Sequence, residues 1–303
     1  MLDLRQLARV EEARLAHGLA EVANEARWLS SGGVVVAGAK RTWANTAAGL
    51  GLGVDRDPAR AGLLDSSSPP ETWGVSGREL DELVEWFVSR GNEPRIDVST
   101  LSHPSLIEGL SARHFVVRLF ESIYYRAIAA GDHPPTTVPG IEVRRVDPSN
   151  AQELRAFAEA VVQGFADTDT PGPDTAASSQ NPALREDLIR VCERSVALPR
   201  TIAVAAFTAS GAVAGGAGVE VLGDVAGLFG ASVLRPYRRM GIQRALIEAR
   251  LRLASERGAR VATIGSRPGV ATERNARRAG FLVGYTRVIL ARPGAGLDTV
   301  ADS

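Results

Sequence analysis

The sequence predicts an α/β protein of the α+β kind, made of two similar halves that each hold a mixed, mostly antiparallel sheet flanked by helices. Each half contains an apolar glycine-rich run, an amphipathic helix, a short strand, a short helix and a long strand in this order. The closing segments ARHFVVRLFESIYY and ARRAGFLVGYTRVI can be laid over each other. Between the halves, the stretch AAGDHPPTTVPG is dense in proline, glycine and threonine, which is typical of a linker.

These features set the expected domain boundaries. The chain has 303 residues, which is enough for two ordinary domains. We expect an N-terminal domain over 1–130, a linker over 131–140, a C-terminal domain over 141–293 and a disordered tail over 294–303.

The elements of the second half follow from apolar periodicity and turn residues. The pattern predicts a strand over 141–148, helices over 151–165 and 182–195, strands over 201–208, 211–222 and 224–234, a helix over 238–258, a strand over 260–265, a short helix over about 270–279 and a strand over 280–290. A polar loop is expected over 166–181. The glycine-containing breaks between the three central strands are hairpin signals, so we expect an antiparallel meander there.

The first half repeats the later part of this order. The N-terminal segment has charges and leucines at helical spacing. After it we expect an apolar glycine-rich strand over 46–54, a helix over 77–91, a strand over 94–99, a short helix over 104–112 and a long strand over 113–128. Gly49, Gly51 and Gly53 alternate at period two, which predicts that they line one side of a strand and hold no phosphate. The run GGVVVAGAK resembles the start of a dinucleotide-binding fingerprint, but no G-x-G-x-x-G follows it.

Composition narrows the function classes. Lys+Arg and Asp+Glu are both 35, and this balance disfavours a nucleic-acid partner. The single cysteine, Cys192, excludes an intrachain disulfide and is expected to be a buried small apolar residue. The four histidines have no metal-ligand spacing, so we expect no metal site. The uncharged run 201–219 is rich in small residues and contains no leucine, so we expect strands there, no membrane association and a cytoplasmic protein.

The stretch LRPYRRMGIQRAL leads from a strand through two arginines and a glycine directly into a helix. A helix N-terminus exposes up to four unpaired N–H groups and about half a positive charge. Gly241 has no Cβ to keep an anion away from these groups, and Arg238, Arg239 and Arg244 add cationic side chains. Since each hydrogen bond to a charged group contributes about 1.5–3 kcal/mol, three or four amides on a diphosphate supply most of a micromolar affinity of about −8 kcal/mol. The alternative is a solvated basic turn at the start of an ordinary amphipathic helix.

This turn resembles the acyl-CoA pyrophosphate signature of the GCN5-related N-acetyltransferases, the GNAT family, whose pattern is Gln/Arg-x-x-Gly-x-Gly/Ala. Arg238 and Gly241 match it, while Gln243 departs from the final Gly/Ala. The element order over about 141–290 and the segment SRPGVATERNARRAGFLVGYTR also resemble the family, and the first half resembles the degenerate first half of its tandem members. The resemblance implies that acetyl-CoA is bound by the turn residues Val233, Leu234, Arg238, Arg239, Met240, Gly241, Ile242, Gln243 and Arg244.

Two residues of the last predicted helix extend this expected site. Asn275 and Arg278 are expected to contact the pantetheine arm or the adenosine phosphate of coenzyme A. The alternative interpretation is that Asn275 caps the helix and Arg278 is solvated.

The resemblance also implies a reaction: transfer of an acetyl group from acetyl-CoA to a primary amine by direct attack, without a covalent enzyme intermediate. An alkyl ammonium group with a pKa near 10.4 must first lose a proton, at a penalty of about 4.6 kcal/mol at pH 7. Glu220, in the middle strand of the meander, is the candidate general base, with a solvent-facing strand residue as the alternative. A backbone N–H where the strand splays at 232–234 is expected to hold the oxyanion.

The general acid is less well defined by the sequence. The family usually has a tyrosine four residues before its Gly-Phe pair, and here that position is Ala276. Tyr285 is the candidate, unless its strand register points it into the core. A free thiol has a pKa near 8.5, so the thiolate can also leave without an acid.

The acceptor remains open among small metabolites, antibiotics, peptide termini and protein lysines. Asp167, Asp169 and Asp174 are candidates to recognise a cationic acceptor, or else belong to a mobile polar linker. We expect a small-molecule or peptide amine partner and a monomer or homodimer. The alternatives to an enzyme are a catalytically weak or inactive acyl-CoA-binding regulatory module and a two-domain interaction surface with no cofactor.

Overall fold

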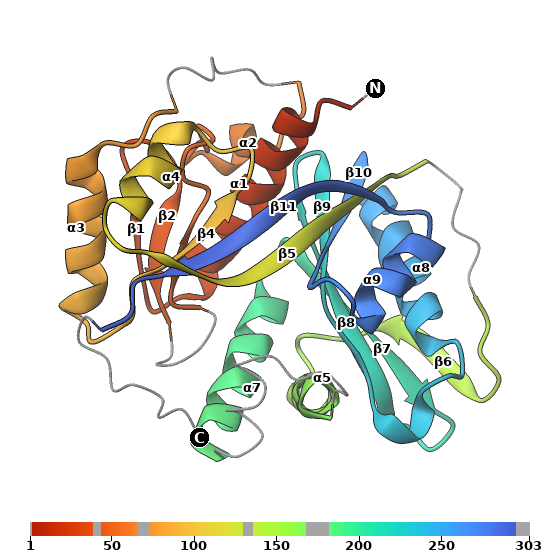
Figure 1. The fold of residues 1–303 in the computed structure, drawn as a ribbon. Coiled ribbons are helices and arrows are strands. Elements are labelled where there is room, and N and C mark those ends of the chain that lie inside the picture. Colours follow the sequence, from red (N-terminus) through yellow and green to blue (C-terminus); the bar gives the residue numbers. More distant parts are fainter. Residues whose placement is uncertain (1, 39–43, 66–72, 130–135, 168–181, 295–303) are drawn as a thin grey trace. The chain divides into compact units, whose positions relative to one another are not determined.

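The computed structural model describes residues 2–38, 44–65, 73–129, 136–167 and 182–294 (Figure 1). They form two units. Unit 1 comprises Met1–Ile123 and Val283–Ser303, and unit 2 comprises Tyr124–Leu282.

Unit 1 contains a sheet with helices against it. Its elements are α1 (Leu4–Val22), β1 (Glu25–Trp28), β2 (Val34–Ala37), β3 (Thr46–Ala48), α2 (Pro58–Ala61), α3 (Gly77–Val88), β4 (Arg95–Ser99), α4 (Pro104–Ser111), the first part of β5 (Val116–Ala127) and nearly all of β11 (Leu282–Ala291). The strand order is β1-β2-β3-β4-β11-β5. The amphipathic helices α3 and α4 contribute Leu83, Phe87 and Leu106 to a core that includes Ile96 and Val98 of β4.

Unit 2 holds the meander predicted from the glycine breaks. Its elements are the last residues of β5, then β6 (Ile141–Arg145), α5 (Ala151–Ala166), α7 (Pro182–Ala197), β7 (Thr201–Thr208), β8 (Val213–Leu222), β9 (Val225–Val233), the 3₁₀ turn η2 (Arg235–Tyr237), α8 (Ile242–Glu256), β10 (Val261–Ser266) and α9 (Ala271–Arg278). The strand order is β5-β10-β9-β8-β7-β6, with β10 parallel to β9 and the meander antiparallel.

Helices cover both faces of the unit 2 sheet. Ile242 and Leu246 of α8 and Ala276 of α9 share one apolar core. Phe157 of α5 and Ile189 of α7 belong to a second core, on the other face. The first face therefore carries the helix that follows the arginine-rich turn.

The predicted element types are confirmed for most of the described chain, but the predicted domain boundary is not. Residues 283–291 were expected in the C-terminal domain, whereas β11 pairs with β4 of unit 1, Val288 lying opposite Val98. Residues 124–127 of β5 belong to unit 2 in turn. Alternation of apolar residues identifies a strand but carries no information on its pairing partner.

The interpretation of Gly49, Gly51 and Gly53 as strand residues is wrong. β3 ends at Ala48, and these glycines have φ values of +78°, +70° and +59°. Positive φ is the left-handed region, in which glycine avoids the clash of a Cβ atom. Their period of two thus reflects a repeated turn conformation.

Several expectations fall outside the described residues. These are Asp169 and Asp174, most of the polar loop over 166–181, the first part of the linker over 131–140, and nearly all of the tail over 294–303. In the part of the chain that is described, no helix has the length and apolarity needed to cross a membrane.

Candidate active site

Strands β9 and β10 separate within unit 2. Their parallel pairing ends where Gly227 lies opposite Thr263. Beyond this point β9 continues to Val233 and stays paired on its other edge with β8, where Val233 lies opposite Gly215. Residues 228–233 therefore present one backbone edge that β10 does not pair.

A β-bulge lies on this unpaired stretch. Gly218 is opposite Phe229 and Gly216 is opposite Ser232, so β9 has one extra residue between the two pairs. Gly230 within the bulge has φ +60°, again a conformation that favours glycine. Bulges bend a strand and redirect its backbone and side chains, and they are frequent beside active sites.

The turn between β9 and α8 leaves a run of backbone donors open. Arg239 and Gly241 have φ values of +66° and +89°, and the first N–H bonded within α8 belongs to Ala245, which donates to the Gly241 carbonyl at 3.1 Å. None of the six N–H groups of residues 239–244 has an acceptor among the described residues, and no side chain caps the helix. Successive N–H groups in such a turn, at the positive end of a helix dipole, form an anion-binding concavity.

Glycine at position 241 is required by backbone conformation more than by crowding. A Cβ built there would meet only the Val138 side chain, at 4.0 Å. Val138 is buried in the core of unit 2, so the last part of the predicted linker packs beside this turn.

The three arginines of the turn differ in what they contact. The Arg238 guanidinium donates to the carbonyls of Val233 and Asp167, both at 3.1 Å, so it joins the end of β9 to the end of α5. Arg244 is bonded to Glu248 at 2.8 Å along α8. Among the described residues, Arg239 has no side-chain partner and is exposed. The expectation that all three side chains surround an anion is therefore corrected: Arg238 is used within the fold.

Glu220 lies at the level where the strands separate. It is opposite Gly227, the last residue of β9 that pairs with β10, and is 6% exposed. Its carboxylate accepts a hydrogen bond from Arg200 at 3.1 Å. Since Val219 and Val221 belong to the core under α8, Glu220 is on the opposite face of β8. The carboxylate is thus buried and ion-paired, and the alternative of a solvent-facing residue is wrong.

The structure does not support Tyr285 as a general acid. Its hydroxyl donates to Glu12 at 2.7 Å in the interior of unit 1, and the side chain is 5% exposed. Burial raises the pKa of Tyr285 well above its usual value. The strand register points this side chain into the core, which was the alternative interpretation. Ala276 is itself buried.

The remaining predicted residues lie on α7 and α9. Asn275 is half-buried and Arg278 is exposed, on a helix that covers the same face of the sheet as α8.

Burial raises the pKa of Cys192 to about 12, so its sulfur stays a thiol and is a poor nucleophile. No cluster of three or more His, Cys, Asp or Glu residues within the described ranges is arranged to hold a metal ion.

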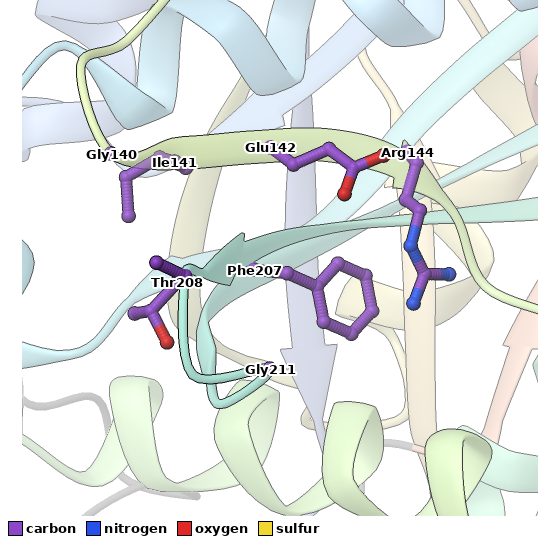
Figure 2. Close-up of a pocket in the computed structure, with 8 residues that line it drawn as sticks. Gly140, Ile141, Glu142, Arg144, Phe207, Thr208 and Gly211 are labelled. Atoms are coloured by element: carbon purple, nitrogen blue, oxygen red, sulfur yellow. The ribbon is translucent and has the colours of Figure 1, made fainter.

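A shallow pocket on the outer edge of unit 2 is a separate feature (Figure 2). It lies along β6 and β7, where Arg144 stacks over the Phe207 ring at 3.8 Å and is paired with Glu153 at 2.8 Å. β8 lies between these two strands and the unpaired stretch of β9. The pocket therefore does not belong to the site at the strand separation.

Comparison with known proteins identifies the fold. A solved GCN5-related N-acetyltransferase from Kribbella flavida is 20% identical to this chain, with a TM-score of 0.60, over 93% of this chain and 96% of that one. A tandem GNAT protein from the clavulanic acid biosynthesis pathway is 14% identical, with a TM-score of 0.53, over 95% of this chain and 93% of that one. The chain has the tandem GNAT fold.

The match confirms the fold class predicted from the two similar halves and the turn. No protein-family model and no curated protein matches the sequence. Unit 2 of this fold carries the separated strands and the open turn.

Proposed function

We propose that unit 2 binds acetyl-CoA and transfers its acetyl group to a primary amine by direct attack. The observation that carries the proposal is the run of open N–H groups over 239–244, placed directly after the unpaired stretch of β9. A doubly charged diphosphate would accept hydrogen bonds from these donors. The exposed Arg239 side chain would add a cation.

The strand geometry supports a path for the rest of the co-substrate. Residues 228–233 cover about 16 Å at roughly 3.3 Å per residue. A pantetheine arm lying along this edge would pair with the backbone in place of β10 and carry the thioester toward Gly227, opposite Glu220. Asn275 and Arg278 are the proposed contacts from α9.

Chemistry at that point would proceed in one displacement. Glu220, directly or through water, takes the proton of the acceptor ammonium group, and the amine nitrogen then forms a bond to the acetyl carbon. The C–S bond breaks and the electron pair leaves with sulfur as the thiolate of coenzyme A. The nitrogen, which carries a positive charge once the N–C bond has formed, loses its second proton to water and becomes the neutral amide. Backbone N–H groups of 228–233 stabilise the oxyanion that develops between these events. No side-chain acid is required for a thiolate of this pKa.

A second candidate function is an acyl-CoA-binding regulatory module without turnover. Two contacts favour it, because each holds a candidate catalytic group: the Tyr285 hydroxyl donates to Glu12, and the Glu220 carboxylate is paired with Arg200. In both cases we propose a cytoplasmic protein, since one cysteine suits a reducing compartment, and a monomer or homodimer. The acceptor of the enzyme would be a small-molecule or peptide amine.

Two measurements test the proposal. Calorimetric titration should give a micromolar Kd for acetyl-CoA and at least about 100-fold weaker binding of acetyl-pantetheine, which lacks the diphosphate. Release of the coenzyme A thiol should then occur with one class in a panel of amines. Binding without turnover on any amine favours the regulatory module, and absence of acetyl-CoA binding rejects both.

A further inference from the structure

Arg250 is a buried cation under the bulge of β9. Its side chain projects from α8, is 1% exposed, and donates from Nη1 to the carbonyls of Gly218 at 3.2 Å and Phe229 at 3.4 Å. Nε donates to the Leu246 carbonyl at 3.0 Å. Gly218 and Phe229 are the directly opposed pair that precedes the bulge, so one guanidinium holds both strands at the point where the register changes.

Stability alone does not account for this residue. No carboxylate among the described residues acts on Arg250, and burial lowers its pKa to about 9, which leaves it charged at neutral pH. Burying an uncompensated charge destabilises a fold by several kcal/mol. Its neighbours on this face of α8 are apolar, including Leu246 and Leu253, and a leucine or methionine would continue that face.

The hydrogen bond to Phe229 also sets the direction of the next amide. The peptide group that joins Phe229 and Gly230 is planar and trans, so its carbonyl and its N–H point in opposite directions. With the carbonyl turned toward Arg250, the Gly230 N–H points away from α8. A charged donor on the carbonyl polarises the peptide and makes that N–H a stronger donor.

We infer that Arg250 is a positioning residue for the proposed reaction: it fixes the bulge so that the amides of the unpaired β9 edge point at the thioester carbonyl. This inference rests on the proposed function. It assigns the binding of coenzyme A to the turn before α8 and the polarisation of the acetyl group to the bulge, so the two can be separated experimentally.

Isotope-edited infrared spectroscopy of bound acetyl-CoA, labelled with ¹³C at the acetyl carbonyl, measures that polarisation without an acceptor. In the native protein the carbonyl band should lie at lower frequency than in water. In Arg250→Met it should return toward the frequency in water, while the Kd for acetyl-CoA stays unchanged. Arg250→Lys keeps a cation but loses the Nε donor that ties the side chain to the Leu246 carbonyl, so its band should lie between the two. With any amine that is turned over, kcat of Arg250→Met should fall about 10- to 100-fold.

The matched control is Arg252→Met, two residues along the same helix. Arg252 is half-exposed and contacts Glu256 at 3.5 Å, so its loss should leave the band in place. A native-frequency band in Arg250→Met, or in Arg250→Lys if the methionine variant does not fold, would overturn the inference. Absence of acetyl-CoA binding to the native protein would instead reject the proposed function itself.

Discussion

Arg238, Arg239 and Gly241 lie within four positions of one another, and the turn uses each differently. Arg238 bonds to main-chain carbonyls of the fold, Arg239 adopts a left-handed backbone and leaves its side chain exposed, and Gly241 allows the last left-handed step into α8. The backbone conformation therefore leaves the N–H groups of this turn without acceptors, and the exposed Arg239 side chain adds one positive charge. The sequence pattern predicted the position of this turn from Gly241, but side-chain direction depends on carbonyls contributed by α5 and β9, which no local pattern specifies.

The role of Arg250 was not predicted from the sequence pattern. It falls four residues after Leu246 on the apolar face of α8, and a charged residue at such a position is the available signal. The carbonyls that it bonds belong to β8 and β9, so its role depended on the sheet register. That register became available only with the structure.

Glu220 leads to a prediction for a single residue. If it is the general base, Glu220→Gln should lower kcat by about 10²- to 10⁴-fold and leave the Kd for acetyl-CoA unchanged. Thiol-release kinetics and calorimetry measure the two quantities. Arg200→Met is the control, because it removes the ion-pair partner and keeps the carboxylate. Full kcat in Glu220→Gln would show that the carboxylate serves only the ion pair.

At the scale of elements, helix α1 carries buried charges into unit 1. Glu12 is fully buried, accepts hydrogen bonds from Tyr285 at 2.7 Å and Arg287 at 2.9 Å, and Arg287 is also paired with Glu121 at 2.7 Å. Burial raises the pKa of Glu12, while Arg287 and Tyr285 oppose this shift. Helical spacing predicted α1 but did not show where its charged residues lie. They are buried because β11, more than 250 positions later in the chain, supplies their partners.

This cluster predicts a non-additive effect on stability. Arg287→Met leaves the Glu12 carboxylate buried without its cation and should lower the free energy of unfolding by about 3–5 kcal/mol. Adding Glu12→Leu removes the unpaired carboxylate and should restore part of the lost free energy of unfolding. Urea unfolding of the two single variants and the double variant measures the coupling. Simple addition of the two single effects would contradict an ion pair of this strength.

At the scale of the whole molecule, the two halves have the same element order but different turns. In unit 1 the chain turns at Gly49 to Gly53 directly after β3, and this turn is covered: a Cβ on Gly53 would lie 2.3 Å from the Trp73 ring, and one on Gly49 would meet Ala16 of α1 at 3.4 Å. In the first turn of α3, the N–H group of Glu79 donates to the Ser76 side chain at 3.2 Å. Order and element type were predictable from periodicity. The pairing of β11 with β4 was not, because both halves end in similar strands.

These differences predict one acetyl-CoA per chain, bound by unit 2. Calorimetry at protein concentrations well above Kd should give a stoichiometry near one, since residues 49–52 of the unit 1 turn are buried, whereas residues 239–241 of the unit 2 turn are exposed. A stoichiometry of two would mean that the covered turn of unit 1 opens to accept a second molecule.

The account depends most on the amides before α8 holding the diphosphate of coenzyme A, and one calorimetric comparison tests this directly. Gly241→Glu and Gly241→Gln have the same size and the same backbone strain at φ +89°, and they differ only by a negative charge beside the proposed diphosphate. We predict that the glutamate variant binds acetyl-CoA at least about 100-fold more weakly than the glutamine variant, because two like charges would meet at the helix N-terminus. Equal affinities in the two variants would contradict this placement of the coenzyme.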